Sequence, residues 1–216
     1  TADGKRFSVT FGSNGMLESY IYDGKEMIAA APEYNDFRNI DNECKDEDDS
    51  KTYSPTDNGI TSHKAGNLKK DGNNYTLTTT ATGSKCNYTV TYTIYPNGVV
   101  DMDVALTTSS TMLRRKGMAM QFAAGFEDVE FYAKGPWANY SDRNTGSFLG
   151  RYHTTVDGMF EELTHPQTNG DHLGLRDLLL TNPTNGLCLR IQTEGDVAFS
   201  LSHYDETQWS HDTKYT

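Results

Sequence analysis

The chain has 216 residues, and its 30 acidic against 19 basic side chains give a net charge of −11. This excess of negative charge excludes a nucleic-acid partner, because phosphates would be repelled. No segment approaches the roughly 18 consecutive apolar residues of a membrane span, and the N-terminal residues lack the order of a signal peptide. A chain of this length fits one large domain, which folds without a disulfide or a metal.

The three cysteines, Cys44, Cys86 and Cys188, show no C-x-x-C spacing. An odd number without paired spacing does not indicate a disulfide framework. Cys86 and Cys188 lie in strand-like runs, where a free cysteine acts as a small apolar side chain, so we expect both to be buried. The sequence has no zinc-binding spacing either, and we expect no metal and no cofactor.

The first thirty residues predict three strands. Residues 6–11 alternate apolar and polar side chains, which is the period of a half-buried strand. Ser13-Asn14-Gly15 connects this run to 17–22, and Asp23-Gly24 connects that run to 27–30. Two tight turns between three short strands predict an antiparallel meander.

The periodicity disappears between Pro32 and Leu68, where six acidic side chains lie within 41–49. A charge run of this kind predicts a solvated loop. An EF-hand would need Gly at the sixth and Glu at the twelfth position, but counting from Asp41 these positions hold Asp46 and Thr52. An EF-hand is therefore excluded, and irregular calcium binding stays an open alternative.

The rest of the chain predicts more strands, because Thr, Tyr, Val and Ile recur in alternating runs. Asn97-Gly98 between two of these runs is a strong hairpin signal. The expected strands lie within 74–82, 85–95, 99–106, 112–126, 129–133, 148–154, 178–181, 187–192 and 198–201. Only 205–211 has a helical pattern. The sequence therefore predicts an all-β fold, a large antiparallel β-sandwich.

The stretch 131–151 carries the densest group of aromatic and polar side chains. Gly135-Pro136 ends a strand, because proline fixes φ and lacks a ladder donor. The side chains expected on the loop that follows are Trp137, Asn139, Tyr140, Asp142 and Arg143. An aromatic face beside amide and charged groups suits a sugar, which offers an apolar ring face and many hydroxyls.

Three motifs in and after this stretch form a pattern that resembles a known family. They are Gly135-Pro136-x-x-Asn139-Tyr140-x-Asp142-Arg143, Gly150-Arg151-Tyr152, and Pro166-Gln167-x-Asn169-Gly170 followed by Arg176. A weaker match covers 34–38 and Asp41-Asn42. The pattern resembles the C-terminal domain of β-galactosidases of glycoside hydrolase family 2, a large β-sandwich similar to galactose mutarotase.

The resemblance implies one β-sandwich domain over residues 1–216, excised from the C-terminal part of a larger glycosidase and lacking the last strands of that domain. In this family both catalytic glutamates belong to a barrel domain of the same polypeptide, which is the implied partner. The chain shows no barrel-like alternation of strands and helices. We therefore expect no catalytic residue in it and no cleavage of glycosides by it alone. The resemblance implies a soluble bacterial protein, cytoplasmic or periplasmic, and leaves galactoside contact and an oligomer of the parent open.

Two residues depart from the family pattern. Ala138 and Thr168 stand where the family usually has Glu. Two carboxylates that could accept hydrogen bonds from sugar hydroxyls are therefore absent together.

The candidate carbohydrate-binding residues lie on the loop and on segments beyond it. They are Trp137, Asn139, Asp142, Arg143, Gln167, Asn169, Arg176 and His203. Trp137 is either a stacking platform or a core aromatic. We expect Asn139 to hydrogen-bond loop backbone, Asp142 and Arg143 to form an ion pair, and Arg176 to hold the loops together.

Two rival functions stay open. One is a free-standing carbohydrate-binding module. The other is an aldose 1-epimerase, in which a histidine acts as an acid. The candidate acids are His153, His165, His172 and His203. A single histidine in a β domain is more often structural, and the absent glutamates speak against catalysis more than against binding.

Overall fold

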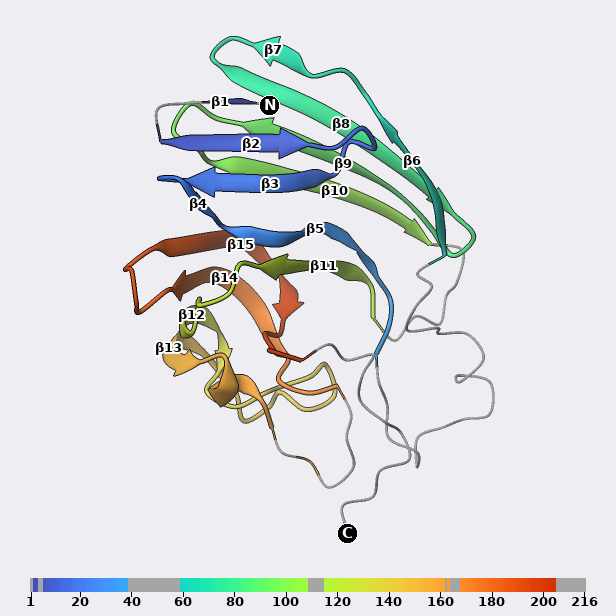
Figure 1. The fold of residues 1–216 in the computed structure, drawn as a ribbon. Helices are drawn as coiled ribbons and strands as arrows, with labels where there is room; N and C mark the ends of the chain where they lie inside the picture. Colours follow the sequence, from blue (N-terminus) through green and yellow to red (C-terminus); the bar gives the residue numbers. More distant parts are fainter. Residues whose placement is uncertain are drawn as a thin grey trace. The chain divides into compact units, whose positions relative to one another are not determined.

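The structure is a computed structural model that describes residues 2–3, 6–38, 59–108, 115–161, 163 and 168–204 (Figure 1). Its elements are β1 (Ala2–Asp3), β2 (Phe7–Phe11), β3 (Leu17–Tyr22), β4 (Lys25–Glu26), β5 (Ile28–Asn35), β6 (Ile60–Ala65), β7 (Lys69–Asp71), β8 (Asn74–Gly83), β9 (Cys86–Ile94), β10 (Val100–Thr108), β11 (Gly117–Phe122), β12 (Asp128–Gly135), β13 (Phe148–Thr155), the short 3-10 helix η3 (Asp157–Met159), β14 (His172–Thr181) and β15 (Cys188–Phe199). The ladders are antiparallel, which confirms the predicted all-β class.

The chain divides into two compact units. Unit 1 comprises Thr1–Phe37 and Tyr53–Ala123, and unit 2 comprises Arg38–Thr52 and Ala124–Thr216. The single domain over 1–216 stays a prediction. The described residues include no helix with the length and apolarity needed to cross a membrane.

Unit 1 contains three sheets, with strand orders β1-β2-β3-β4, β10-β9-β8-β6 with β7 on β8, and β11-β5 (Figure 1). The core of the unit joins all three, because Val9 of β2 and Ile28 of β5 belong to one buried cluster with the inner face of β9. That face consists of Cys86, Tyr88, Val90, Tyr92 and Ile94. Each large apolar side chain buried in this way stabilises the fold by about 1.5–3 kcal/mol. The sheets of unit 1 therefore pack in the predicted sandwich manner.

Two turns of unit 1 follow from their residues. Asp23 and Gly24 both have positive φ, 46° and 74°, and close the two-residue connection between β3 and β4. The turn at Gly98 spans residues 96–98, as the predicted strand bounds imply, since Tyr95 N–H donates to Val99 O, but of Asn97 and Gly98 only Gly98 takes a positive φ, 91°. It still joins β9 and β10 as the predicted hairpin.

Several strand predictions need correction. The segment 32–68 is not aperiodic throughout: β5 continues to Asn35, and β6 pairs with β8. β6 escapes a periodicity search because none of its side chains is buried. β15 is one strand where two runs were predicted, since the bulge around 193–196 interrupts its alternation. The acidic stretch 41–49, Cys44 and the helical pattern at 205–211 lie outside the described residues.

The cysteine prediction is half right. Cys86 is buried, with 1% of its surface exposed. Cys188 is exposed, so its predicted burial is wrong. The reason is its position, because it begins β15, the last strand of its sheet, and lies opposite Thr181 with a sulfur–hydroxyl distance of 3.4 Å.

Unit 2 is built on one sheet of strand order β13-β12-β14-β15. Its buried face centres on Phe131, whose ring lies 5.4 Å from the ring of Tyr152 and 4.7 Å from that of His172. Leu178 and Leu180 of β14 are buried on the same face, because they pair with Phe131 and Val129 of β12. The loop of interest leaves this sheet at Gly135, the last residue of β12.

Candidate functional site

The loop from 136 to 147 connects β12 to β13. It begins with a cis peptide bond between Gly135 and Pro136. A Cβ on Gly135 would lie 2.8 Å from the ring of Tyr152, so only glycine fits where the strand turns into the loop. The sequence correctly places the strand end here, since proline cannot continue the ladder.

Asn139 anchors this loop and is fully buried. Its Nδ2 donates to the carbonyl oxygens of Lys134 and Trp137, each at 3.0 Å. Its Oδ1 accepts from the backbone N–H of Leu173 on β14 at 3.0 Å. The predicted backbone role of Asn139 is therefore confirmed, and its polar atoms are all engaged.

Tyr140 lies between two guanidinium groups. Those of Arg38 and Arg143 are each 5.2 Å from the centre of its ring, a cation–π distance. Burial raises the pKa of the Tyr140 phenol, and the negative charges of Asp171 and Glu161 add to the effect. The sequence contains Arg38 and Tyr140 in separate motifs and gives no sign that they meet.

The predicted ion pair between Asp142 and Arg143 is wrong. Arg143 lies instead 3.4 Å from Glu161 and also donates to the carbonyl of Ala138 at 3.4 Å. The backbones of Arg143 and Tyr140 form an isolated antiparallel bridge, in which each N–H donates to the carbonyl of the other residue. This bridge directs the Arg143 side chain over the Tyr140 ring. Asp142 is exposed at the turn of this bridge.

Trp137 points away from the core, with 76% of its surface exposed. The alternative in which it is a core aromatic is therefore excluded. Ala138 and Thr168, where family members usually have Glu, are both buried. Neither position therefore offers an exposed side chain that could bind a sugar hydroxyl.

The remaining candidates do not gather around Trp137. Asn169 is buried and accepts from the backbone N–H of Glu161 at 2.9 Å, and Gln167 lies outside the described residues. His203 lies 2.8 Å from Glu127 and 3.0 Å from Asp157, at the start of β12. The strand between this position and the loop is about 25 Å long.

Arg176 does not hold the loops together, so that expectation is wrong. It lies on β14 and is exposed, with its guanidinium 5.9 Å from the ring centre of Tyr132. The pairing register of β14 and β15 shifts between Leu175 and Asp177, with the extra residues, 193–196, on β15, and Arg176 is exposed at this irregularity.

His172 is buried against Phe131 and Phe199, and its Nδ1 lies 2.9 Å from the carbonyl oxygen of Lys134. Burial lowers its pKa. His153 is exposed on β13, and His165 lies outside the described residues. Among the described side chains, no group of three His, Cys, Asp or Glu could hold a metal ion.

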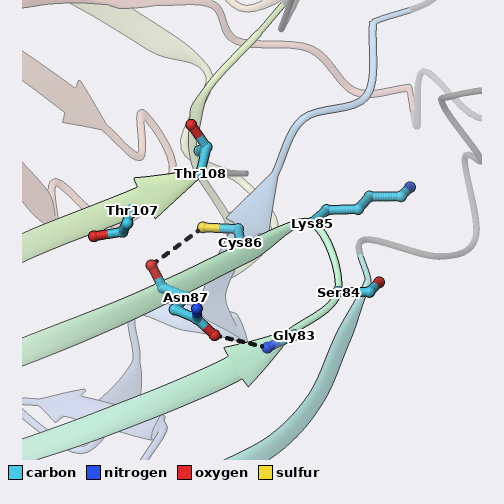
Figure 2. A pocket seen from close by; sticks show the side chains of 7 residues that line it. All are labelled: Gly83, Ser84, Lys85, Cys86, Asn87, Thr107 and Thr108. Atoms are coloured by element: carbon cyan, nitrogen blue, oxygen red, sulfur yellow. Dashed lines mark hydrogen bonds between the residues drawn. The ribbon is translucent and has the colours of Figure 1, made fainter. Parts of the chain in front are cut away.

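A cavity of about 190 Å³ lies in unit 1, at the ends of β8, β9 and β10 (Figure 2). Its lining includes the Cys86 thiol, whose pKa burial raises, and Asn87, whose Oδ1 accepts from Gly83 N–H at 3.1 Å. Figure 2 shows the Lys85 side chain extending away from the other lining residues. The cavity is smaller than the roughly 300–1,000 Å³ of most small-molecule sites and has no carboxylate in its lining.

The fold and the loop define an all-β domain whose loop side chains bind backbone and one another rather than forming an acid–base pair. Comparison with known proteins then identifies the family. The family model described as "Beta galactosidase small chain" matches residues 3–215, so the chain belongs to this family and the resemblance seen in its motifs is confirmed.

Curated relatives named "Beta-galactosidase" are similar to the chain. That of Halalkalibacterium halodurans is 29% identical over 93% of this chain and 21% of its own length. Those of Staphylococcus xylosus and Priestia megaterium are 28% and 33% identical over 58% and 43% of this chain, and over 13% and 9% of their own lengths. The chain thus spans about a fifth or less of the relatives that it matches.

Proposed function

We propose that the chain is a non-catalytic domain of a β-galactosidase, which supports the catalytic part of the enzyme while that part hydrolyses terminal β-galactosides. The family match over residues 3–215 carries this proposal. Retaining glycoside hydrolysis needs two free carboxyl groups about 5 Å apart. Of the carboxylates near the loop, Glu161 pairs with Arg143.

The geometry of the loop favours a structural supporting role over a catalytic role. Asn139 and His172 both bind the carbonyl of Lys134, so the polar groups of the loop fix its shape. A rigid loop on a sheet is suited to present a constant surface to a neighbouring domain.

The test is deletion of residues 1–216 from the complete enzyme. We expect loss of β-galactoside hydrolysis together with loss of assembly, measured by product release and by sedimentation. Normal activity and assembly without the domain would refute the supporting role.

Carbohydrate contact is a second candidate function, favoured by the exposure of Trp137 on the loop 136–147. An exposed indole can stack on the apolar face of a sugar, and Asp142 and Arg143 are the nearby exposed polar side chains. Titration with galactose or lactose, followed by isothermal titration calorimetry, tests this role. Trp137→Ala should abolish a response that Trp137→Phe retains, and no response in the parent protein would exclude it.

An aldose 1-epimerase has less support. The histidine nearest the loop, His172, is buried and held by a backbone carbonyl. Polarimetry on fresh α-galactose should show no acceleration over buffer.

A further inference from the structure

Unit 2 exposes most of the large apolar side chains found on the surface. Among the described residues eight are exposed, and six of these lie in unit 2. They are Trp137, Phe148, Leu149, Phe160, Val197 and Tyr204. Phe160 and Tyr204 lie against each other, with ring centres 5.9 Å apart.

Phe148 and Leu149 open β13, which is an edge strand. β13 pairs along its length with β12, and no described strand pairs with its other side. An edge strand presents free N–H and C=O groups, and native proteins keep such an edge short, charged or covered. Here the edge is eight residues long and begins with two apolar side chains that are 70% and 44% exposed.

Arginine and tyrosine side chains continue this surface. Leu149 and Arg151 share one face of β13, because successive side chains alternate, and Tyr132 lies directly opposite Arg151 on β12. The guanidinium groups of Arg151 and Arg176 lie 5.5 and 5.9 Å from the centre of the Tyr132 ring. Arg151 also pairs with two acidic side chains, whereas Arg176 has no ion pair within the described part of the chain.

We propose that Tyr132, Leu149, Arg151 and Arg176, the β13 edge surface, dock against the larger polypeptide of the enzyme. The inference rests on the proposed function and names the surface through which it operates. Aromatic and arginine side chains are the residue types enriched at the centres of interfaces. The partner surface should present apolar side chains to Leu149 and a carboxylate to Arg176.

The larger polypeptide is the occupant that fits best. The relatives have 79% or more of their length outside the matched region, since the chain covers at most 21% of those compared. A second copy of the chain fits less well, because each copy carries a net charge of −11 and the two would repel. A sugar fits poorly, since Leu149 offers no ring on which it could stack.

Photo-cross-linking in the complete enzyme tests the assignment. A benzoylphenylalanine in place of Leu149 should cross-link to a peptide from outside these 216 residues, identified by mass spectrometry. The matched control is the same group in place of Val99, which is 49% exposed in unit 1 and should give no such product. Cross-links only to another copy of residues 1–216, or none at all, would overturn the proposal.

A double variant provides a second readout. The combined substitutions Leu149→Glu and Arg176→Glu place negative charge where we expect apolar and acidic side chains of the partner. The half-life of enzyme activity at a fixed elevated temperature should shorten about tenfold, while Val99→Glu leaves it unchanged. Equal half-lives would contradict the docking surface.

The two proposals fail in different ways. If deletion of the domain leaves activity and assembly intact, the supporting role itself fails. If deletion abolishes them while position 149 gives no cross-link, only the β13 edge surface is wrong.

Discussion

Asn139→Ala removes the side chain that ties the loop after β12 to β14. The residue is fully buried, so water cannot replace its hydrogen bonds without opening the loop. The carbonyl of Lys134 keeps a partner, the Nδ1 of His172 at 2.9 Å. The N–H of Leu173 and the carbonyl of Trp137 lose theirs.

Two backbone groups left without partners give the magnitude. Each costs about 1–3 kcal/mol, so the free energy of unfolding should fall by about 2–6 kcal/mol. Whole domains are stable by only about 5–15 kcal/mol, so the loss should be plain in urea unfolding.

Amide hydrogen exchange provides a local check, because the Leu173 N–H should exchange much faster in the variant. The matched control is Asn144→Ala in the same loop. Asn144 also binds backbone carbonyls, those of Tyr140 at 3.0 Å and Ser141 at 2.9 Å, but it is only partly buried. It should cost less than about 1 kcal/mol, because water can take its place. Equal effects of the two substitutions, or unchanged exchange at Leu173, would refute the reasoning.

Three further predictions follow from the described contacts. Asp177→Asn should destabilise by about 1–2 kcal/mol in thermal unfolding, because this nearly buried carboxylate accepts from Arg190 at 2.6 and 2.9 Å. The same pair lowers the Asp177 pKa, so its stabilisation holds above the ordinary carboxyl range and is lost as pH falls through the lowered value, as an acid unfolding series would show. Trp137→Ala should change stability by less than about 0.5 kcal/mol in urea, since the side chain is exposed. Burial raises the pKa of Tyr88 and of Tyr92 to about 12, so ultraviolet titration should show two late phenols, and stability should fall as pH rises from about 10 to 12.

The loop 136–147 shows which features of a site can be predicted from a sequence pattern. The strand end at Gly135 and the backbone role of Asn139 follow from local chemistry, and both are found. The partner of Arg143 does not follow, because the nearest acid in sequence is Asp142 and the one in space is Glu161. Assignment of the loop residues to carbohydrate stays a prediction.

The sequence by itself determined the all-β class, most strand positions and the family, because alternation, turn residues and motifs are local properties of the chain. Only the tertiary structure decided which distant residues meet. It brings Arg38 to Tyr140, and it exposes Cys188 at the edge of a sheet. It places Arg176 at a register irregularity between β14 and β15, with its guanidinium 5.9 Å from the ring centre of Tyr132. Strand order and register set these contacts, and both depend on pairing between segments far apart in the sequence.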